Sequence, residues 1–174
     1  VVTNDEKLGN KARHLTTQAR CDPVEYDHDE IGFNYRLTNI QAAIGVAQME
    51  SLRKFIRIKR GNAKLYEKLL STIKDVELLK EKKWARNNSW FYTLKVPKKQ
   101  KNKLMKYLLS KNIQVRPVWK PLHTLPIYRK CQAFNVVNAV KAYDCCINLP
   151  CSVNLKEDEI RIIANYIRKY FKNL

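Results

Sequence analysis

The chain has 174 residues, 45% of them hydrophobic and 29% charged, a composition that supports a packed core in one or two domains. No apolar run approaches the roughly 20 residues that span a bilayer, which excludes a membrane-spanning helix from this sequence. The net charge of +18 is uneven, because residues 1–60 hold 10 Lys/Arg and 8 Asp/Glu (+2) whereas residues 61–174 hold 24 and 8 (+16). Such an excess can indicate a nucleic acid or a phosphorylated ligand. The lysines are dispersed without interleaved aromatic residues, which favours a solvated surface.

The N-terminal residues predict a helix. The first two residues are valines typical of the end of a strand, and the chain lacks an initial Met, so we expect it to continue a longer protein. Asn4 or Asp5 can then cap a helix with Leu8 and Leu15 on one face. His14 lies off this face, and we expect it on the surface.

Residues 20–31 form an acidic loop in which Asp27 and Asp29 flank His28. Such a cluster could bind a metal, but neighbouring side chains point apart in an extended chain, which favours loop polarity without an ion. The five cysteines form no C-x-x-C pair and lack the spacing of zinc ligands relative to the histidines. We therefore expect no metal site, and free thiols in a reducing cytoplasm.

A long central helix is predicted to begin at Thr38. Thr38 and Gln41 have the spacing of a capping box, in which the side chain of each residue bonds the amide of the other. Small and apolar residues follow, and the helical pattern continues to Leu70. The preceding loop, residues 32–36, is therefore expected to be held in a fixed place before a helix N-terminus.

After about residue 73 the pattern changes to short strands that alternate with helices. The predicted strands are residues 76–79, 90–96, 113–119 and 146–149. The predicted helices are residues 104–109, residues 135–144 and a last helix that starts within 154–157, and residues 98–103 are predicted to be a basic connection. The second half is therefore expected to be a small α/β unit, whereas the helices of the first half are expected to pack on a part that this chain does not contain.

Two segments carry polar side chains that suit an anionic ligand. The loop Gly32-Phe-Asn-Tyr-Arg36 precedes a helix N-terminus, where free amides and the helix dipole favour an anion. Asn34 and Arg36 add side-chain donors. The second segment places Arg116 and His123 among prolines at the end of a strand. The residues alone leave open whether the first set binds a phosphate or only its own loop, and they favour a solvated edge strand for the second.

Several motifs together resemble one family. They are Val1-Val-Thr-Asn-Asp5; His28-x-x-Ile-Gly-Phe-Asn-Tyr-Arg36 with Asn39-Ile-Gln-Ala-Ala-Ile-Gly-x-Ala-Gln48; Val115-Arg-Pro-Val-Trp119 with Pro121-Leu-His123; and Asn148-Leu-Pro-x-Ser152. In this order they resemble the DegT/DnrJ/StrS nucleotide-sugar aminotransferases over nearly all of the chain. The segment His14-Leu-Thr-Thr-Gln-Ala19 further resembles the branch that acts on UDP-linked 4-keto-6-deoxy-N-acetylhexosamines, as in legionaminic acid biosynthesis.

The resemblance implies the C-terminal part of an α/β enzyme of aminotransferase fold type I that depends on pyridoxal 5'-phosphate (PLP). Residues 1–72 would be the end of the large PLP-binding domain with its long connecting helix, and residues 73–174 the small C-terminal α/β domain. Such enzymes move an amino group, usually from L-glutamate, to a keto carbon of a nucleotide-linked deoxysugar, in cell-surface or secondary-metabolite sugar biosynthesis. The resemblance also implies a homodimer with a shared active site. From the thiols, the hydropathy and the dispersed charge we expect a cytoplasmic protein with no membrane partner and no nucleic-acid partner.

The resemblance gives roles to four residues. Asn34 matches the family residue that reaches the PLP phosphate of the partner subunit, and Arg36, in the same loop, would help to bind the phosphate of the cofactor or of the sugar nucleotide. Arg116 and His123 match a segment that faces the substrate cleft. Phe33 stands where Tyr is common in the family. The Schiff-base Lys of the family lies upstream of the matched part, so no residue of this chain is assigned a catalytic role.

Two alternatives stay open. The chain could be a non-catalytic remnant or a dimerising fragment of such an enzyme, if no cofactor domain precedes it. It could also be a basic nucleic-acid-binding module, although the dispersed charge favours this less. The residues do not predict which sugar is bound, which carbon is aminated or which amino donor is used.

Overall fold

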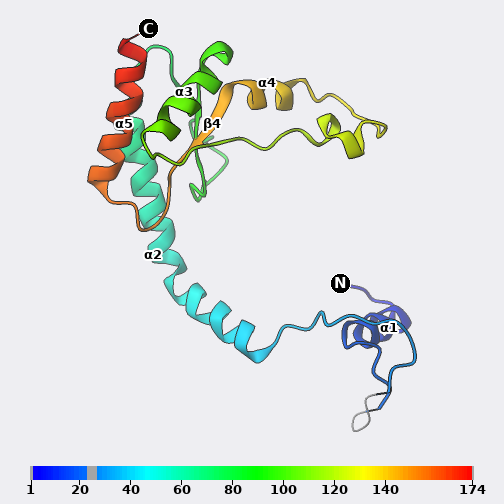
Figure 1. The fold of residues 1–174 in the computed structure, drawn as a ribbon. Helices are drawn as coiled ribbons and strands as arrows, with labels where there is room; N and C mark the ends of the chain where they lie inside the picture. Colours follow the sequence, from blue (N-terminus) through cyan, green and yellow to red (C-terminus); the bar gives the residue numbers. More distant parts are fainter. Residues whose placement is uncertain (1, 23–26, 174) are drawn as a thin grey trace. The chain divides into compact units, whose positions relative to one another are not determined.

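The computed structural model describes residues 2–22 and 27–173 (Figure 1). It divides into two compact units, one that ends at Ser51 and one that starts at Leu52, and each is described by itself. Of the predicted strand end, Val1 lies outside the described residues and Val2 has no regular structure. None of the helices within the described ranges is both long and apolar enough to cross a membrane.

Local capping fixes the starts of the first two helices. Helix α1 (Glu6–Thr16) begins after Asp5, whose carboxylate accepts a hydrogen bond of 3.0 Å from the Leu8 amide, as predicted. Helix α2 (Asn39–Leu70) begins after Thr38. The Thr38 amide donates to the Gln41 side chain (2.9 Å) and the Gln41 amide donates to the Thr38 hydroxyl (3.3 Å), which confirms the predicted capping box.

The unit from Leu52 onward contains a four-stranded antiparallel sheet with the strand order β1-β2-β4-β3. The strands are β1 (Glu77–Leu78), β2 (Tyr92–Lys95), β3 (Arg116–Pro117) and β4 (Cys146–Leu149). All four predicted strands are confirmed, but the third pairs only at two residues of the predicted 113–119. Ile113 and Val115 are buried outside the ladder, and Pro117 has no amide hydrogen with which to extend it.

Three further helices belong to this unit: α3 (Lys98–Ser110), α4 (Val137–Cys145) and α5 (Glu157–Lys172). Two short 3₁₀ turns, η1 (Leu122–Thr124) and η2 (Pro126–Tyr128), precede α4. The basic connection predicted at residues 98–103 is wrong, because this segment forms the first turns of α3. Its Lys and Gln residues favour helix, and Pro97 stands at the cap position.

The last helix begins later in the sequence than it would if Asn154 were its N-cap. Helix α5 begins at Glu157, and the Lys156 amide donates to the Glu159 carboxylate over 2.7 Å. Glu157, Asp158 and Glu159 lie in its first turn, where negative charge is favourable. The buried face of this helix is as predicted, with Ile160, Ile163, Ala164 and Ile167 all in the core.

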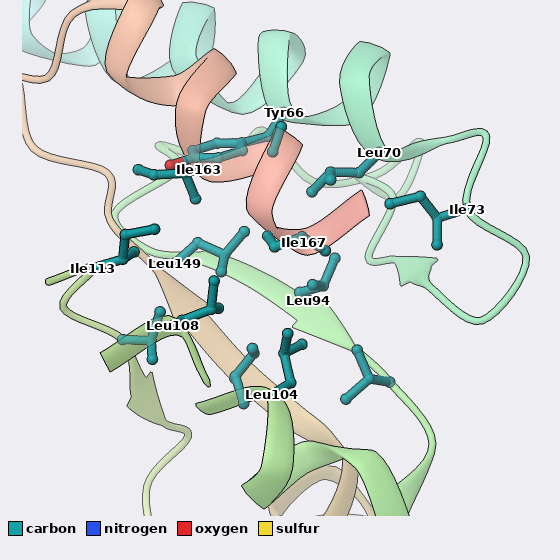
Figure 2. Close-up of a cluster of buried hydrophobic side chains, with 14 of the residues drawn as sticks. Tyr66, Leu70, Ile73, Leu94, Leu104, Leu108, Ile113, Leu149, Ile163 and Ile167 are labelled. Atoms are coloured by element: carbon teal, nitrogen blue, oxygen red, sulfur yellow. The ribbon is translucent and has the colours of Figure 1, made fainter. Parts of the chain in front are cut away.

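The hydrophobic core of this unit lies between the sheet and helices α2, α3 and α5. Figure 2 shows side chains from these elements converging on one cluster. Fully buried members are Tyr66 and Leu70 of α2, Leu94 of β2, Leu104 and Leu108 of α3, and Ile147, Ile160 and Ile167. All four residues of β4 are buried, and the strand order makes β4 one of the two interior strands of the sheet.

Three side chains of α2 bind the segment that follows β4. The Tyr66 hydroxyl donates to the Pro150 carbonyl (3.0 Å), the Lys59 ammonium to the Cys151 carbonyl (2.6 Å) and the Asn62 amide to the Ser152 carbonyl (3.1 Å). Donors three and four positions apart lie on one face of a helix, so a single face of α2 fixes three successive carbonyls.

The rings of Tyr66 and Tyr92 stack with their centroids 4.9 Å apart, but the two hydroxyls have different contacts. Desolvation by burial raises the pKa of both phenols. The Tyr66 hydroxyl has its carbonyl partner, whereas the buried Tyr92 hydroxyl has no hydrogen-bond partner among the described residues. A buried hydroxyl without a partner costs desolvation energy.

We therefore expect opposite effects from two Tyr→Phe substitutions. Tyr66→Phe should lower the free energy of unfolding by about 1–2 kcal/mol, because the Pro150 carbonyl loses its donor. Tyr92→Phe should leave this free energy unchanged or raise it, because it removes an unpaired hydroxyl. Urea denaturation of both variants measures the difference. Equal losses in the two variants would contradict the assigned contacts.

Candidate functional site

The loop of residues 32–36 is tied by its backbone to the end of α1. The Phe33 amide donates to the Leu15 carbonyl (2.7 Å), and the Tyr35 amide to the Thr16 carbonyl (3.1 Å). Thr17 and Asn34 form an isolated antiparallel bridge. The structure thus fixes the backbone on both sides of Asn34, in agreement with the expected fixed loop.

Gly32 lies in close contact with the backbone beyond α1. A Cβ atom built on Gly32 would stand 2.2 Å from the carbonyl carbon of Gln18 and 2.3 Å from the amide nitrogen of Ala19. Gln18 and Ala19 themselves have φ values of 66° and 50°, so the chain reverses sharply there. Only glycine fits at position 32 without a shift of the backbone.

Asn34 and Arg36 are exposed in this loop, and neither side chain makes a hydrogen bond within the described residues. Both keep their donors available a few residues before the first turn of α2, where amide groups also lack helical partners. An amide and a guanidinium together suit the oxygens of a phosphate. The structure places the two predicted residues in one short loop.

His14, Asp29 and Glu30 form a second polar group in the first unit. The His14 Nε2 atom lies 2.6 Å from Asp29 Oδ1 and 3.5 Å from Glu30 Oε1, and Lys11 also pairs with Glu30. The hydrogen bond from His14 lowers the pKa of Asp29. Their possible ligand atoms lie within 4.8 Å of one another. His14 is thus partly buried and paired, rather than the isolated surface residue expected from its position on the helix.

His28 does not join this group. Its Nδ1 atom donates to the Gln18 carbonyl over 2.7 Å, which supports the sharp reversal at that point. All five cysteines are free thiols, as predicted, and burial raises the pKa of Cys146 and Cys151.

In the second unit, Arg116 belongs to a row of side chains that crosses the sheet. The strand register pairs Arg116 of β3 with Asn148 of β4, and Asn148 with Thr93 of β2. Paired residues of antiparallel strands share one face, and this face is opposite to that of Ile147 and Leu149 in the core. The Thr93 hydroxyl donates to the Asn148 Oδ1 atom over 2.7 Å.

A cavity of about 260 Å³ lies at this row. Its lining comes from α2, β3, β4 and the segments that flank β2 and β4, and it includes Lys59, Trp90, Phe91, Gln114, Arg116 and Asn148. Arg116 is exposed and makes no hydrogen bond or ion pair within the described residues. A cationic donor without a partner at the wall of a cavity can bind an anionic ligand.

His123 lies in η1 and is partly buried. The turn is fixed by the Pro121 carbonyl, which accepts from both the amide (2.9 Å) and the hydroxyl (2.7 Å) of Thr124. His123 makes no hydrogen bond within the described residues and does not line the cavity beside Arg116. The structure therefore leaves these two predicted residues in separate local environments.

Other residues of the second unit were not singled out by the sequence. Lys59 and Asn148 line the Arg116 cavity because of helix packing and strand register, which leave no local sequence signal. A further cavity of about 780 Å³ is lined by basic side chains and, within the described residues, by no carboxylate. Its charged residues are Arg53, Arg57, Arg60, Lys64 and Arg86.

The comparison with protein families matches residues 1–168 to the model of the DegT/DnrJ/EryC1/StrS aminotransferase family. The chain belongs to this family. The match covers both units, and it agrees with the resemblance of the motifs that contain Asn34, Arg36, Arg116 and His123.

Curated members of the aminotransferase family are similar over most of the chain. GDP-perosamine synthase from Escherichia coli O157:H7 is 34% identical over 175 residues, which are 99% of this chain and 47% of that protein. The putative pyridoxal phosphate-dependent aminotransferase EpsN from Bacillus subtilis is 40% identical over 133 residues, 74% of this chain and 33% of that protein. The chain spans less than half the length of these relatives.

Solved structures of aminotransferases show the same fold. The aminotransferase TlmJ from Streptoalloteichus hindustanus superposes with a TM-score of 0.84 at 19% identity, covering 98% of this chain and 46% of that one. PseC from Helicobacter pylori, an aminotransferase involved in pseudoaminic acid biosynthesis, superposes with a TM-score of 0.79 at 23% identity. The match covers 99% of this chain and 48% of that one. The predicted α/β fold, as part of a sugar aminotransferase, is thereby confirmed.

We expect the loop of this family member to depend on Gly32. Gly32→Ala should weaken hydrogen-exchange protection of the Phe33 and Tyr35 amides, with a cost of about 1–3 kcal/mol, because its Cβ overlaps the backbone at Gln18. Gly45→Ala is the matched control, since nothing lies within 4 Å of a Cβ built there. That change should stabilise α2 by about 0.5–1 kcal/mol. Unchanged protection of Phe33 and Tyr35 in Gly32→Ala would refute the close approach.

Proposed function

We propose that the protein containing this chain is a PLP-dependent aminotransferase that moves an amino group from L-glutamate to the 4-keto carbon of a nucleotide-linked deoxysugar. The family match over residues 1–168 carries this proposal. Relatives named GDP-perosamine synthase and UDP-4-amino-4,6-dideoxy-N-acetyl-beta-L-altrosamine transaminase support a nucleotide-sugar substrate. The segment from His14 to Ala19 supports the narrower proposal of a UDP-linked 4-keto-6-deoxy-N-acetylhexosamine.

Asn34 and Arg36 are the residues of this chain that we assign to PLP. Their exposed donors fit its phosphate: the Asn34 amide supplies a neutral donor and the Arg36 guanidinium a bidentate one. When bound, PLP supplies the electron sink for the transfer. Asn34 is proposed to act on the cofactor of the partner subunit, which makes the enzyme a homodimer with a shared active site. No lysine of this chain is assigned the Schiff-base role.

Arg116 and His123 are assigned to the substrate. Arg116, which has no partner among the described residues, would bind a phosphate of the sugar nucleotide from the wall of its cavity. His123, held in η1 by the Pro121 carbonyl contacts, would orient the sugar.

The organisation of the whole enzyme is also part of the proposal. We place the end of the large domain at residues 1–72 and the small domain at residues 73–174, because the connecting helix α2 ends at Leu70. The enzyme is proposed to work in the cytoplasm.

The role of Asn34 is testable in the complete protein that contains this chain. Asn34→Ala should weaken PLP retention about tenfold to 100-fold, because a hydrogen bond to a charged group contributes about 1.5–3 kcal/mol. Absorbance after gel filtration measures the PLP that is retained. Asn10→Ala, an exposed change in α1, is the control and should retain PLP as the parent protein does. Unchanged retention in Asn34→Ala would contradict its role.

The same measurement separates the enzyme from a non-catalytic remnant. A complete protein that takes up PLP and transfers the amino group of L-glutamate to a nucleotide-linked keto sugar supports the proposed function. A protein that dimerises but takes up no PLP would instead be the remnant or dimerising fragment.

The cavity of about 780 Å³ that is lined by five basic side chains is the observation that favours a nucleic-acid partner. If its five basic residues bound phosphates of DNA, log Kobs would fall against log salt with a slope of about −4.5, and Arg57→Ala would reduce the magnitude of this slope by about 1. We expect no such slope with duplex DNA, because the family match supports a sugar-nucleotide ligand. A slope of about −4.5 whose magnitude Arg57→Ala reduces would favour the nucleic-acid-binding module.

A further inference from the structure

The loop that carries Asn34 is longer than the segment opposite to it. Arg20 pairs with His28 and Thr17 pairs with Asn34, both in antiparallel bridges. Two residues separate Thr17 from Arg20, whereas five separate His28 from Asn34, so the loop side is longer by three residues. We call residues 29–33 the bulge. A regular ladder fixes the position of each residue, but across such a bulge the register depends on other contacts.

Two consecutive carboxylates at the start of the bulge contact α1. The His14 Nε2 atom lies 2.6 Å from Asp29 Oδ1, and the Lys11 ammonium pairs with Glu30. Lys11 and His14 stand three positions apart, so their side chains lie on one face of the helix. Neighbouring side chains point apart in an extended chain, but the chain bends at Asp29 and Glu30, and both reach this face. We call Lys11, His14, Asp29 and Glu30 the clasp.

Backbone contacts join the clasp to the rest of the bulge. The Asp29 amide donates to the Ala19 carbonyl over 3.2 Å, so Asp29 is held at both its backbone and its side chain. The hydrogen bond from His14 lowers the pKa of Asp29, which favours the ionised carboxylate. Gly32 lies against the backbone of Gln18 and Ala19, in the middle of the bulge. The clasp and Gly32 thus place successive parts of the bulge against the same end of α1.

The clasp is a connected network, which distinguishes it from a single surface ion pair. An exposed pair alone contributes little to stability, whereas several linked pairs can contribute more. The side chain of His14 is only 26% exposed. Its Nε2 atom also lies 3.5 Å from Glu30 Oε1, so Glu30 is shared between His14 and Lys11. Loss of His14 would therefore weaken the contacts of both carboxylates.

We propose that the clasp positions the PLP site, because it sets the register in which Asn34 presents its side-chain amide to the phosphate of the cofactor. A slip of the loop by one residue would turn the Asn34 side chain to the opposite side of the chain. The inference rests on the proposed role of Asn34 and adds four positioning residues to it. The clasp itself acts from α1 and the start of the bulge, without contact to the cofactor.

A structural role fits the clasp better than a metal site does. The ligand atoms of His14, Asp29 and Glu30 lie within 4.8 Å of one another, as in a site for a divalent cation. The Lys11 ammonium already supplies a positive charge to Glu30, and it would repel a second cation at the same place. The carboxylates of the clasp are thus neutralised by the chain itself.

Hydrogen exchange of the complete protein without PLP tests the clasp itself. His14→Ala should speed the exchange of the Phe33 and Tyr35 amides about 5-fold to 30-fold, because both bond α1 carbonyls when the bulge is in register. Arg13→Ala is the matched control. Arg13 is exposed beside His14, and its guanidinium donates to Asn10 within α1 (3.0 Å). This change should leave the exchange of both amides as in the parent protein.

Cofactor binding then tests whether the clasp acts through Asn34. His14→Ala should weaken PLP binding about twofold to tenfold, less than Asn34→Ala does, because affinity falls only by the fraction of chains whose loop is out of register. Pyridoxal, which lacks the phosphate, should bind to His14→Ala and to the parent protein equally. In an Asn34→Ala background, His14→Ala should cause no further loss, because the amide that the clasp positions is already absent.

Conservative variants separate the hydrogen bond of the clasp from the bulk of the ring. His14→Gln keeps an amide donor near the position of Nε2, so the exchange rates and the PLP affinity should return to within about twofold of the parent protein. His14→Leu has similar bulk without a donor and should behave as His14→Ala does. Asp29→Ala removes the other partner, and its combination with His14→Ala should lose no more than either single change.

Three results would overturn the proposal. They are unchanged exchange of the Phe33 and Tyr35 amides in His14→Ala, equal losses of pyridoxal and PLP affinity, and a further loss in the Asn34→Ala background. These results are separable from failure of the proposed function. PLP binding that falls in Asn34→Ala but not in His14→Ala refutes the clasp alone. Faster exchange in His14→Ala of a complete protein that takes up no PLP refutes the aminotransferase, and with it the role of the clasp in cofactor binding.

Discussion

The second unit depends on how one face of α2 binds the segment that follows the interior strand β4. Tyr66, Lys59 and Asn62 donate to the successive carbonyls of residues 150–152, directly after β4. These carbonyls lie just beyond the sheet and, within the described residues, have no partner in a neighbouring strand. The three side-chain donors satisfy them in place of water, and the same contacts fix β4 against the helix. Since β4 pairs with both β2 and β3, its position sets the register of the row that contains Arg116.

Much of the local structure could be predicted from the sequence because it is specified by neighbouring residues. The capping box of Thr38 and Gln41, the strand Cys146–Leu149 and the buried face of α5 all follow from short patterns. The errors have local causes too. Residues 98–103 are rich in Lys, which by polarity suits a loop as well as a helix; the helix propensity of Lys and Gln, Pro97 at the cap and docking beside Tyr143 together favour the helix. There Lys101 contacts the Tyr143 carbonyl and lies 4.1 Å from its ring centroid.

The candidate sites were predictable in part. Asn34 and Arg36 stand close in the sequence, so their shared loop was visible, but the need for glycine at position 32 became clear only from the fold, because Gln18 lies fourteen residues away. The row of Thr93, Asn148 and Arg116 depends on strand pairing between distant segments, which a single sequence does not encode in any local pattern. Aromatic residues such as Trp90 are common both in strands and at binding surfaces. Only their exposure in the structure distinguishes these two roles.

The sheet has features that oppose its growth into a larger assembly. Its two edges are β1 and β3, each only two residues long. Pro117 occupies half of β3 and presents no amide hydrogen, and Glu77 on the other edge pairs with Lys95, so that both edges offer few groups to an incoming strand. These features should keep the sheet at four strands and disfavour edge-to-edge aggregation while aromatic residues of the same unit remain open to solvent.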